Sequence, residues 1–252
     1  MDIELKQRFI KLWDQYFPGA ELPIVFYYSD DPTRAPLAQP AGRQCFICKL
    51  AEVRAGASFA FDVDAVGCGG GKRYLGFVPD LRPGFEYFLS CGLPGEMEGE
   101  RYKRSPELVR ELLKRMPEFK APARTIVFKR WDQMGAEDEP AVVVFFAPPD
   151  VLSGLFTLAG FEEAEPQAVV APFGAGCASI VYYPYLELHA KHPRAVLGMF
   201  DVSARPCVPA TVLTLAIPWP RFARMVENVD ESFLITGSWD KVRARITSQG
   251  AR

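Results

Sequence analysis

The chain has 252 residues, of which 49% are hydrophobic and 24% are charged, and its formal net charge is −2. These values are typical of a soluble globular protein that buries its own hydrophobic core. Because positive charge is not in excess, nucleic acid is not expected as a partner.

The first residues, MDIELKQRFIKLWDQYF, carry charges throughout and lack the apolar run of a secretory signal. The longest apolar runs, such as residues 141–149, reach a proline before they could span a bilayer. We therefore expect a cytoplasmic protein without a membrane partner. Cytoplasmic thiols are kept reduced, so the six cysteines are expected to be metal ligands, reactive thiols or core residues rather than a disulfide framework.

The first quarter of the chain predicts alternating helices and strands. Apolar residues at helical spacing predict a helix over residues 3–17, and a β-branched and aromatic run predicts a buried strand at 22–28. Residues 45–55 are good helix formers followed by Gly56, which is typical of a helix stop. Residues 58–66 alternate in part and predict a strand that runs into a glycine-rich loop.

The remainder predicts a similar alternation after a turn-rich, polar stretch at 79–104. Ser105 as cap and Pro106 in the first turn predict a helix that ends near Met116. Further strands are predicted at 125–129, 141–146, 168–171, 196–200 and 212–217, and further helices from residue 148 and at 178–190, 218–229 and 239–246.

This order predicts the fold class. Strands and helices alternate without a regular βαβ rhythm, which favours an α+β domain built on a mixed β-sheet flanked by helices. We expect a single domain over residues 1–252, with a possible seam near 132–140. The pairs Gly67-Cys68 and Gly176-Cys177 each stand at a predicted strand-loop junction, and this faint likeness leaves open two similar halves.

The cysteines are the first candidate site. Cys45 and Cys48 have the spacing at which two thiolates bind one tetrahedral metal ion. Four thiolates would suit zinc or an iron–sulfur cluster. The candidate metal ligands are Cys45, Cys48, Cys68 and Cys91, with Cys177 or Cys207 as an alternative fourth ligand.

Two other interpretations of the cysteines stay open. Free cysteine is among the most buried residue types, so these side chains could belong to the core. Alternatively, Cys45 and Cys48 could form a redox pair, because a helix N-terminus and the nearby Arg43 and Lys49 would lower a thiol pKa. No strand directly precedes Cys45, which speaks against a thioredoxin-like frame.

The two histidines, His189 and His192, lie three residues apart in LELHAKHP. On a helix they would face roughly the same side and could chelate a metal ion. A solvated helix end, where a cation interacts favourably with the helix dipole, is the more common role of such a pair.

The stretch VGCGGGKR is the second candidate site. Converging backbone N–H groups and the two following cations could bind an anion. The spacing is one residue short of a P-loop and does not match a dinucleotide-binding fingerprint, and a tight strand-to-helix turn explains the glycines equally well. The candidate residues for a small-molecule or anionic ligand are Gly67, Gly69, Gly70, Gly71, Lys72, Arg73 and Arg205.

Arg205 joins that set because of the stretch FDVSARPC. In an extended segment Asp201, Ser203 and Arg205 would project to one face. Arg205 could then bind a carboxylate or phosphate, or it could form a structural ion pair with Asp201.

A loose but collinear pattern runs through the chain. Its first part comprises Arg43, Cys45, Ala51, Gly56, Cys68, Gly69, Gly70, Leu75, Gly76 and Phe77. Later parts are AVVVFFAPPDVLSGLF, PFGAGCASIVYYP, LGMFDVSARP and LAIPWPRFARMVENV. Together they resemble the uncharacterised prokaryotic ArCR family, a domain of unknown function. The resemblance implies a cytoplasmic single-domain protein and marks Cys45, Cys68 and Cys177 as pattern positions, but it implies no activity.

The sequence therefore predicts a metal- or small-molecule-binding protein whose site combines Cys45, Cys68 and the glycine-rich stretch. One alternative is a thiol-dependent or redox enzyme that uses Cys45 and Cys48. A second is a non-catalytic structural or interaction protein with core cysteines.

Overall fold

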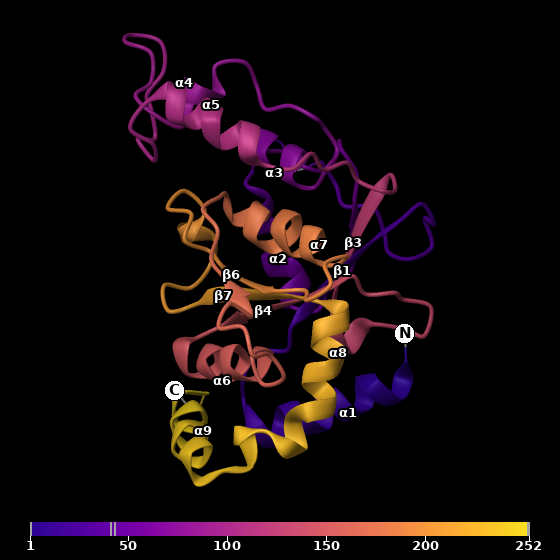
Figure 1. Cartoon of the computed structure of the whole chain (residues 1–252). Helices are drawn as coiled ribbons and strands as arrows, with labels where there is room; N and C mark the ends of the chain where they lie inside the picture. Colours follow the sequence, from indigo (N-terminus) through magenta and orange to yellow (C-terminus); the bar gives the residue numbers. More distant parts are fainter. Residues whose placement is uncertain (1, 41, 43, 251–252) are drawn as a thin grey trace.

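A computed structural model describes residues 2–40, 42 and 44–250. These residues form a seven-stranded sheet in the order β2-β3-β1-β4-β7-β6-β5 (Figure 1). Its strands are β1 (Ile24–Ser29), β2 (Phe59–Phe61), β3 (Thr125–Arg130), β4 (Val142–Ala147), β5 (Val169–Val170), β6 (Ala195–Gly198) and β7 (Leu213–Pro218). Neighbouring strands are antiparallel except β5 and β6, which are parallel. This mixed sheet with flanking helices confirms the predicted α+β class.

Helices cover both faces of the sheet (Figure 1). One face carries α1 (Ile3–Tyr16), α6 (Pro149–Ala159), α8 (Trp219–Asn228) and α9 (Gly237–Gly250). The other carries α2 (Phe46–Arg54), α3 (Gly69–Tyr74), the π-helical turn η2 (Ala178–Tyr182) and α7 (Tyr183–Glu187). Beyond this second layer, α4 (Phe85–Phe88) and α5 (Pro106–Arg115) form an outer lobe (Figure 1). Short 3-10 turns are η1 (Trp131–Gln133), η3 (Arg205–Cys207), η4 (Val229–Glu231) and η5 (Phe233–Ile235).

Strand β4 shows why the central strands are apolar throughout. Val142 and Val144 face the core under α2, whereas Val143 and Phe145 face the core under α1. Side chains alternate between the faces of a strand, so a sheet covered on both sides needs an apolar residue at every position. In the described part of the chain, no helix is both long and apolar enough to cross a membrane.

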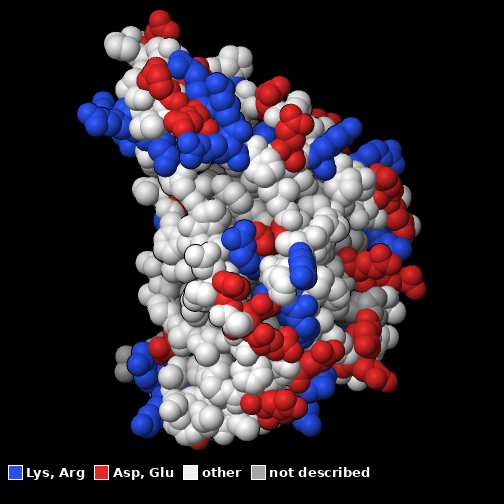
Figure 2. Space-filling view, in the orientation of Figure 1, with Lys and Arg blue, Asp and Glu red and all other residues white. Residues whose placement is uncertain are grey.

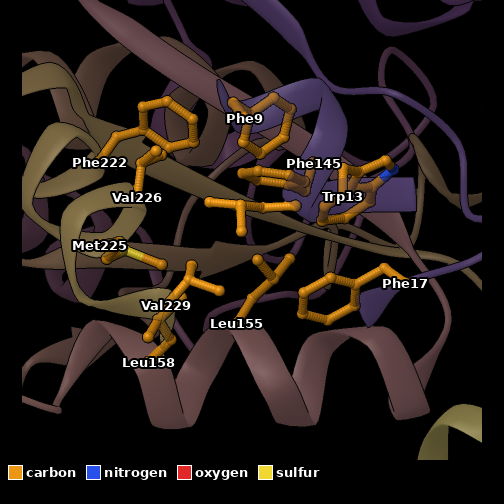
Figure 3. Close-up of a pocket in the computed structure, with 11 residues that line it drawn as sticks. Phe9, Trp13, Phe17, Phe145, Leu155, Leu158, Phe222, Met225, Val226 and Val229 are labelled. Carbon is orange, nitrogen blue, oxygen red and sulfur yellow. The ribbon is translucent and has the colours of Figure 1, made fainter. Parts of the chain in front are cut away.

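The core on the α1 side encloses a small cavity of about 20 Å³ (Figure 3). Apolar and aromatic side chains surround it: Phe9, Leu12, Trp13, Phe17, Phe145, Leu155, Leu158, Phe222, Met225, Val226 and Val229. A cavity of this size and lining is a packing defect of the core rather than a place for a ligand.

Several predicted elements match and others need correction. Ser105 caps α5 as predicted, since its side chain accepts a hydrogen bond from the Leu108 N–H at 3.4 Å. The strand expected at 58–66 is wrong beyond β2, because the Asp62 side chain turns the chain by accepting the N–H groups of residues 64 and 65. The expected glycine-rich loop is also wrong locally, because residues 69–74 form helix α3.

Two predictions in the second half are corrected as well. The stretch 200–207 is not extended, because the Asp201 carboxylate accepts the Ser203 N–H and hydroxyl and bends it into a turn. The helix predicted over 178–190 begins as η2 and ends at Glu187. The histidines expected on one helix face therefore lie beyond the helix. The segment 132–140 connects β3 to β4 within one continuous sheet.

Candidate functional site

The first component of the site is Cys45, the N-cap residue of α2. Helix α2 is fixed over the sheet because Phe46, Ile47, Leu50 and Val53 are all buried in the core beneath it. Cys45 itself is only half-buried and packs against the edge of this core. Its thiol therefore lies where the first backbone N–H groups of α2 are not used inside the helix.

The second component is Cys68, the N-cap residue of α3. Two glycines bring it against α2. A Cβ atom at Gly67 would lie 2.2 Å from the Gly42 carbonyl oxygen, and one at Gly71 would lie 3.3 Å from the Phe46 Cβ. Small residues here let the segment before α3 contact the segment before α2, which explains the glycines that the sequence places around Cys68.

The third component is Cys177, which is buried and stands at the N-terminus of η2. A Cβ atom at Gly176 would lie 3.0 Å from the Met199 Sδ and 3.3 Å from the Ile47 Cγ1, so this segment also packs on α2. The Asp201 carboxylate accepts the Gly176 N–H at 2.9 Å. Cys177 thus joins the same cluster from a third part of the chain.

The backbone around Cys177 departs from regular structure. Met199 is fully buried and has φ 67°, a conformation that residues with a side chain adopt only at an energetic cost. The π-helical hydrogen bonding of η2 is likewise rare and is often found at functional sites. Both irregularities lie next to the cysteine cluster.

Electrostatics distinguish the three sulfur atoms. A hydrogen bond from the Cys45 thiol, aided by the backbone N–H groups of Phe46 and Gly71 and opposed by burial, lowers the pKa of Cys68 to about 6. The same hydrogen bond and burial raise the pKa of Cys45. Burial and the nearby Cys68 charge raise the pKa of Cys177. At neutral pH the cluster therefore holds one thiolate, Cys68, and two thiols.

A disulfide bond joins Cys48 to Cys207 across a sequence separation of 159 residues, with the two Cα atoms 4.6 Å apart. The bond ties the first turn of α2 to η3. The expectation that all the cysteines are reduced is wrong for this pair. Cys48 is therefore not available as the second thiol of a Cys45–Cys48 redox pair in this state.

The structure does not bring the four predicted metal ligands together as thiolates. Cys48 is bonded to Cys207, and Cys91 is exposed at the end of α4, where its sulfur contacts its own loop. Among the described residues, no group of three or more His, Cys, Asp or Glu side chains is placed to hold a metal ion. Binding of zinc or an iron–sulfur cluster stays a prediction.

The two histidines have separate surroundings. His192 Nδ1 lies 3.5 Å from the Glu163 Oε2. The His189 ring stands edge-on to the Tyr185 ring, with centroids 6.2 Å apart. Among the described residues, neither histidine joins the cysteines in a group that could hold a metal ion.

The candidate anion ligands are also dispersed. Gly67 and Gly71 serve close packing, and a Cβ at Gly69 or Gly70 would meet nothing within 4 Å. Arg205 donates to the carbonyl oxygens of Ala210 and Val212, at 2.7 and 2.5 Å, so it closes its own loop rather than forming the expected ion pair with Asp201.

The cations of α3 are the remaining part of that set. Lys72 is half-buried, and the Nη1 of Arg73 is buried without a hydrogen-bond partner in the described residues. Burial raises the pKa of Tyr182 to about 12, and the Arg73 charge opposes this rise. Anion binding by α3 stays a prediction. Arg43, the other cation expected beside Cys45, lies outside the described residues.

The surface above this layer does not present one sign of charge. Figure 2 shows Lys and Arg gathered on the outer lobe of α4 and α5, interleaved with Asp and Glu. Arg110, for example, lies 3.4 Å from Glu86 and 3.3 Å from Glu107. The band of surface below the lobe is largely uncharged (Figure 2). On the face shown in Figure 2, positive charge is therefore interleaved with negative charge rather than continuous.

Comparisons with known proteins identify a family without an assigned activity. A family model for a domain of unknown function, described as uncharacterised ArCR, matches residues 20–228. No curated protein and no solved structure matches the chain.

Proposed function

Because the chain belongs to the uncharacterised ArCR family, whose description offers no activity, we propose its function from the site: Cys68 and Cys45 form a dithiol that reduces the disulfide bond of a small substrate. One observation carries the proposal. Two cysteines from separate segments, the N-cap residues of α2 and α3, meet where a Cβ atom at Gly71 would lie 2.9 Å from the Cys68 sulfur and 3.3 Å from the Phe46 Cβ. Interaction with the Cys45 thiol lowers the pKa of Cys68. Thiolates, not thiols, attack disulfides, so Cys68 is the nucleophile.

The reaction balances with the groups present. The Cys68 thiolate attacks one sulfur of the substrate R–S–S–R′, forming a mixed disulfide Cys68–S–S–R, and R′–S⁻ leaves with the proton of Cys45. The Cys45 thiolate then attacks the Cys68 sulfur, and R–S⁻ leaves. The protein ends with a Cys45–Cys68 disulfide, and the substrate disulfide has gained two electrons.

The neighbouring groups support these roles. The N–H groups of Phe46 and Gly71 favour the charged form of Cys68, as N–H groups at helix starts do for thiolates in general. Cys45 supplies the hydrogen bond first and becomes the second nucleophile afterwards. Cys177 stays a thiol because it is buried, so it packs against the pair without competing for the substrate.

The reduction of a coloured aromatic disulfide, 5,5′-dithiobis(2-nitrobenzoate), tests this function. Cys91 is an exposed free thiol, so the measurement uses a Cys91→Ser background to remove its reaction. We expect a fast release of one thionitrobenzoate, followed by a second as Cys45 displaces the mixed disulfide. Cys45→Ser should stop after the first release with a stable adduct on Cys68, and Cys68→Ser should lose the fast phase.

Two results would overturn the proposal. One is a fast phase that survives in Cys68→Ser, and the other is a second release that survives in Cys45→Ser. Cys91→Ser compared with the unmodified chain is the matched control, since it should remove only a slow reaction with an ordinary surface thiol.

A further inference from the structure

The Cys48–Cys207 disulfide begins on the same helical turn as Cys45. Cys45 caps α2, and the Cys48 N–H donates to the Cys45 carbonyl oxygen at 3.1 Å, which closes the first turn. The side chain of an N-cap residue reaches the second or third residue of its helix, and Cys48 is the third residue of α2. An intact disulfide therefore stands beside the dithiol proposed to exchange with substrates.

The number of cysteines that meet here needs an explanation beyond packing. Cys45, Cys68 and Cys177 are the N-cap residues of α2, α3 and η2. The segments of Cys68 and Cys177 both pack on the first turn of α2, because a Cβ atom at Gly71 would lie 3.3 Å from the Phe46 Cβ and one at Gly176 would lie 3.3 Å from the Ile47 Cγ1. Cys48 brings Cys207 to the same turn through its bond. Five of the six cysteines in the sequence thus meet around the first turn of α2. A thiol held beside a disulfide in the same protein reacts with it intramolecularly, at an effective concentration far above that of a free thiol in solution.

We propose that the Cys48–Cys207 bond and the Cys45–Cys68 dithiol exchange with each other, so that the protein carries an internal disulfide relay. The inference rests on the proposed function, because the Cys48–Cys207 disulfide oxidises the same Cys45–Cys68 dithiol. When the exchange runs backwards, the Cys48 and Cys207 thiols reduce the Cys45–Cys68 disulfide. It requires no outside oxidant.

The relay has two balanced steps. Cys45 passes its proton to Cys68 and attacks the Cys48 sulfur, which forms a Cys45–Cys48 bond and releases the Cys207 thiolate. The proton then passes from Cys68 to the Cys207 thiolate, and Cys68 attacks the Cys45 sulfur, which forms the Cys45–Cys68 bond and releases the Cys48 thiolate. One proton and one electron pair pass from the Cys45–Cys68 pair to the Cys48–Cys207 pair, and the number of disulfides is unchanged.

The loop that carries Cys207 is built to stay in place while the bond is open. Arg205 donates to three carbonyl oxygens of its own loop, and the Asp201 carboxylate accepts the Gly176 N–H at 2.9 Å. Ala204 is buried against the same core as α2. These contacts do not depend on the disulfide, so the released Cys207 thiolate remains near Cys48 and the relay can run backwards.

The two-step order gives the CxxC spacing of Cys45 and Cys48 a use. A disulfide between them is the intermediate through which the bond moves from Cys48–Cys207 to Cys45–Cys68. A redox pair at Cys45 and Cys48 is thus part of the relay rather than its resting state.

Disulfide mapping tests the relay. The Cys91→Ser protein, with the Cys48–Cys207 bond formed and the other cysteines reduced, is held at pH 8 without oxygen or external thiol. It is then quenched in acid, alkylated and analysed by peptide mass spectrometry. We expect three bonds, Cys48–Cys207, Cys45–Cys48 and Cys45–Cys68. Cys68→Ser should show only the first two bonds, and Cys45→Ser should show only Cys48–Cys207.

The relay is wrong if Cys48–Cys207 stays the sole bond in the protein with Cys45 and Cys68 intact, or if new bonds still form in Cys45→Ser. The first measurement alters no relay cysteine, so it holds even if a variant fails to fold. A Cys48→Ser/Cys207→Ser variant separates the two proposals. This variant cannot carry out the relay, so release of two thionitrobenzoates from it supports the dithiol function independently of the relay. Loss of that release in a folded variant contradicts the dithiol function itself.

Discussion

Gly71 and Cys68 lie so close that a Cβ atom at position 71 would stand 2.9 Å from the Cys68 sulfur. Real Cβ atoms do not approach neighbours this closely without displacement, and the Val66 side chain, at 2.7 Å, closes the other side. The Cys68 sulfur can therefore occupy this position at the start of α3 only because residue 71, one turn later, has no side chain.

Gly71→Ala is expected to lower stability by about 1–3 kcal/mol, the usual cost of overpacking, and to slow the fast thiol reaction of Cys68. Gly69→Ala is the matched control, because a Cβ there meets nothing within 4 Å. Alanine favours a helix over glycine, so Gly69→Ala should be neutral or stabilising by up to about 1 kcal/mol. Urea unfolding and thiol kinetics measure both effects. Equal effects of the two substitutions would contradict the packing argument.

The reactivity of Cys68 should follow its lowered pKa. With a pKa of about 6, the rate of alkylation by iodoacetamide should rise through pH 6 and be nearly level above pH 7. Cys45→Ala removes the donor that contributes most to this pKa, so the midpoint should move towards the ordinary thiol value. Cys45→Ser retains a hydroxyl donor and should shift the midpoint less. A midpoint that is the same in both variants would show that the Cys45 hydrogen bond is not the cause.

Stability should depend on pH through the same two cysteines. Between pH 6 and about 9 the folded protein holds Cys68 as a thiolate, whereas the unfolded chain binds a proton there, so stability should rise with pH. Above pH 9 the raised pKa of Cys45 reverses the sign, because the folded state then keeps a proton that the unfolded chain has lost. Subtracting the unfolding free energies of Cys68→Ser from those of the parent protein isolates this contribution. A difference that does not change between pH 6 and 9 contradicts it.

The elements that local pattern determines were predictable. Helix α5 follows from Ser105 and Pro106, and β4 follows from an apolar run of strand length. Local propensity predicts a loop rather than a helix at residues 69–74, because three consecutive glycines disfavour a helix. In the structure, tertiary packing of Gly71 and Tyr74 into the core makes them helical.

The site was partly predictable for a similar reason. The family resemblance marked Cys45, Cys68 and Cys177, and the structure places these three together. The Cys48–Cys207 bond could not be inferred, because disulfide connectivity cannot be read from cysteine spacing and these two residues are 159 positions apart. The sequence suggests Arg205 as an ion-pair partner of Asp201, whereas in the structure the Asp201 carboxylate accepts the Gly176 N–H.

Loss of that disulfide should lower stability considerably. In the chain-entropy model, a bond that closes a loop of this length stabilises the folded state by about 5 kcal/mol. Cys48→Ser/Cys207→Ser should therefore unfold at a clearly lower urea concentration than the oxidised parent. The reduced parent is the matched comparison, because it has the same sequence with the bond opened. A double variant as stable as the oxidised parent would contradict the presence of the bond.

The last prediction concerns Asp138, in the acidic turn before β4. Its carboxylate is 2% exposed and accepts hydrogen bonds from Lys129 at 2.8 and 3.0 Å, from the Gly135 N–H at 2.7 Å and from the Tyr27 hydroxyl. Burial alone would raise the pKa of Asp138, but these donors outweigh it and hold the pKa below its usual value. The carboxylate therefore stabilises the fold above pH 4, and this contribution is lost as the pH falls through the lowered pKa.

Asp138→Asn keeps the shape of the side chain but leaves the Lys129 charge buried without its counter-ion, which should cost about 3–5 kcal/mol. Glu111→Gln removes one partner of the exposed Glu111–Arg115 pair and is the matched control, with an expected cost below about 1 kcal/mol. Urea unfolding at pH 7 compares the two. The difference between Asp138→Asn and the parent should shrink below pH 4, because the parent then loses the same charge. Equal costs at pH 7 would mean that the buried pair contributes no more to the fold than a surface pair does.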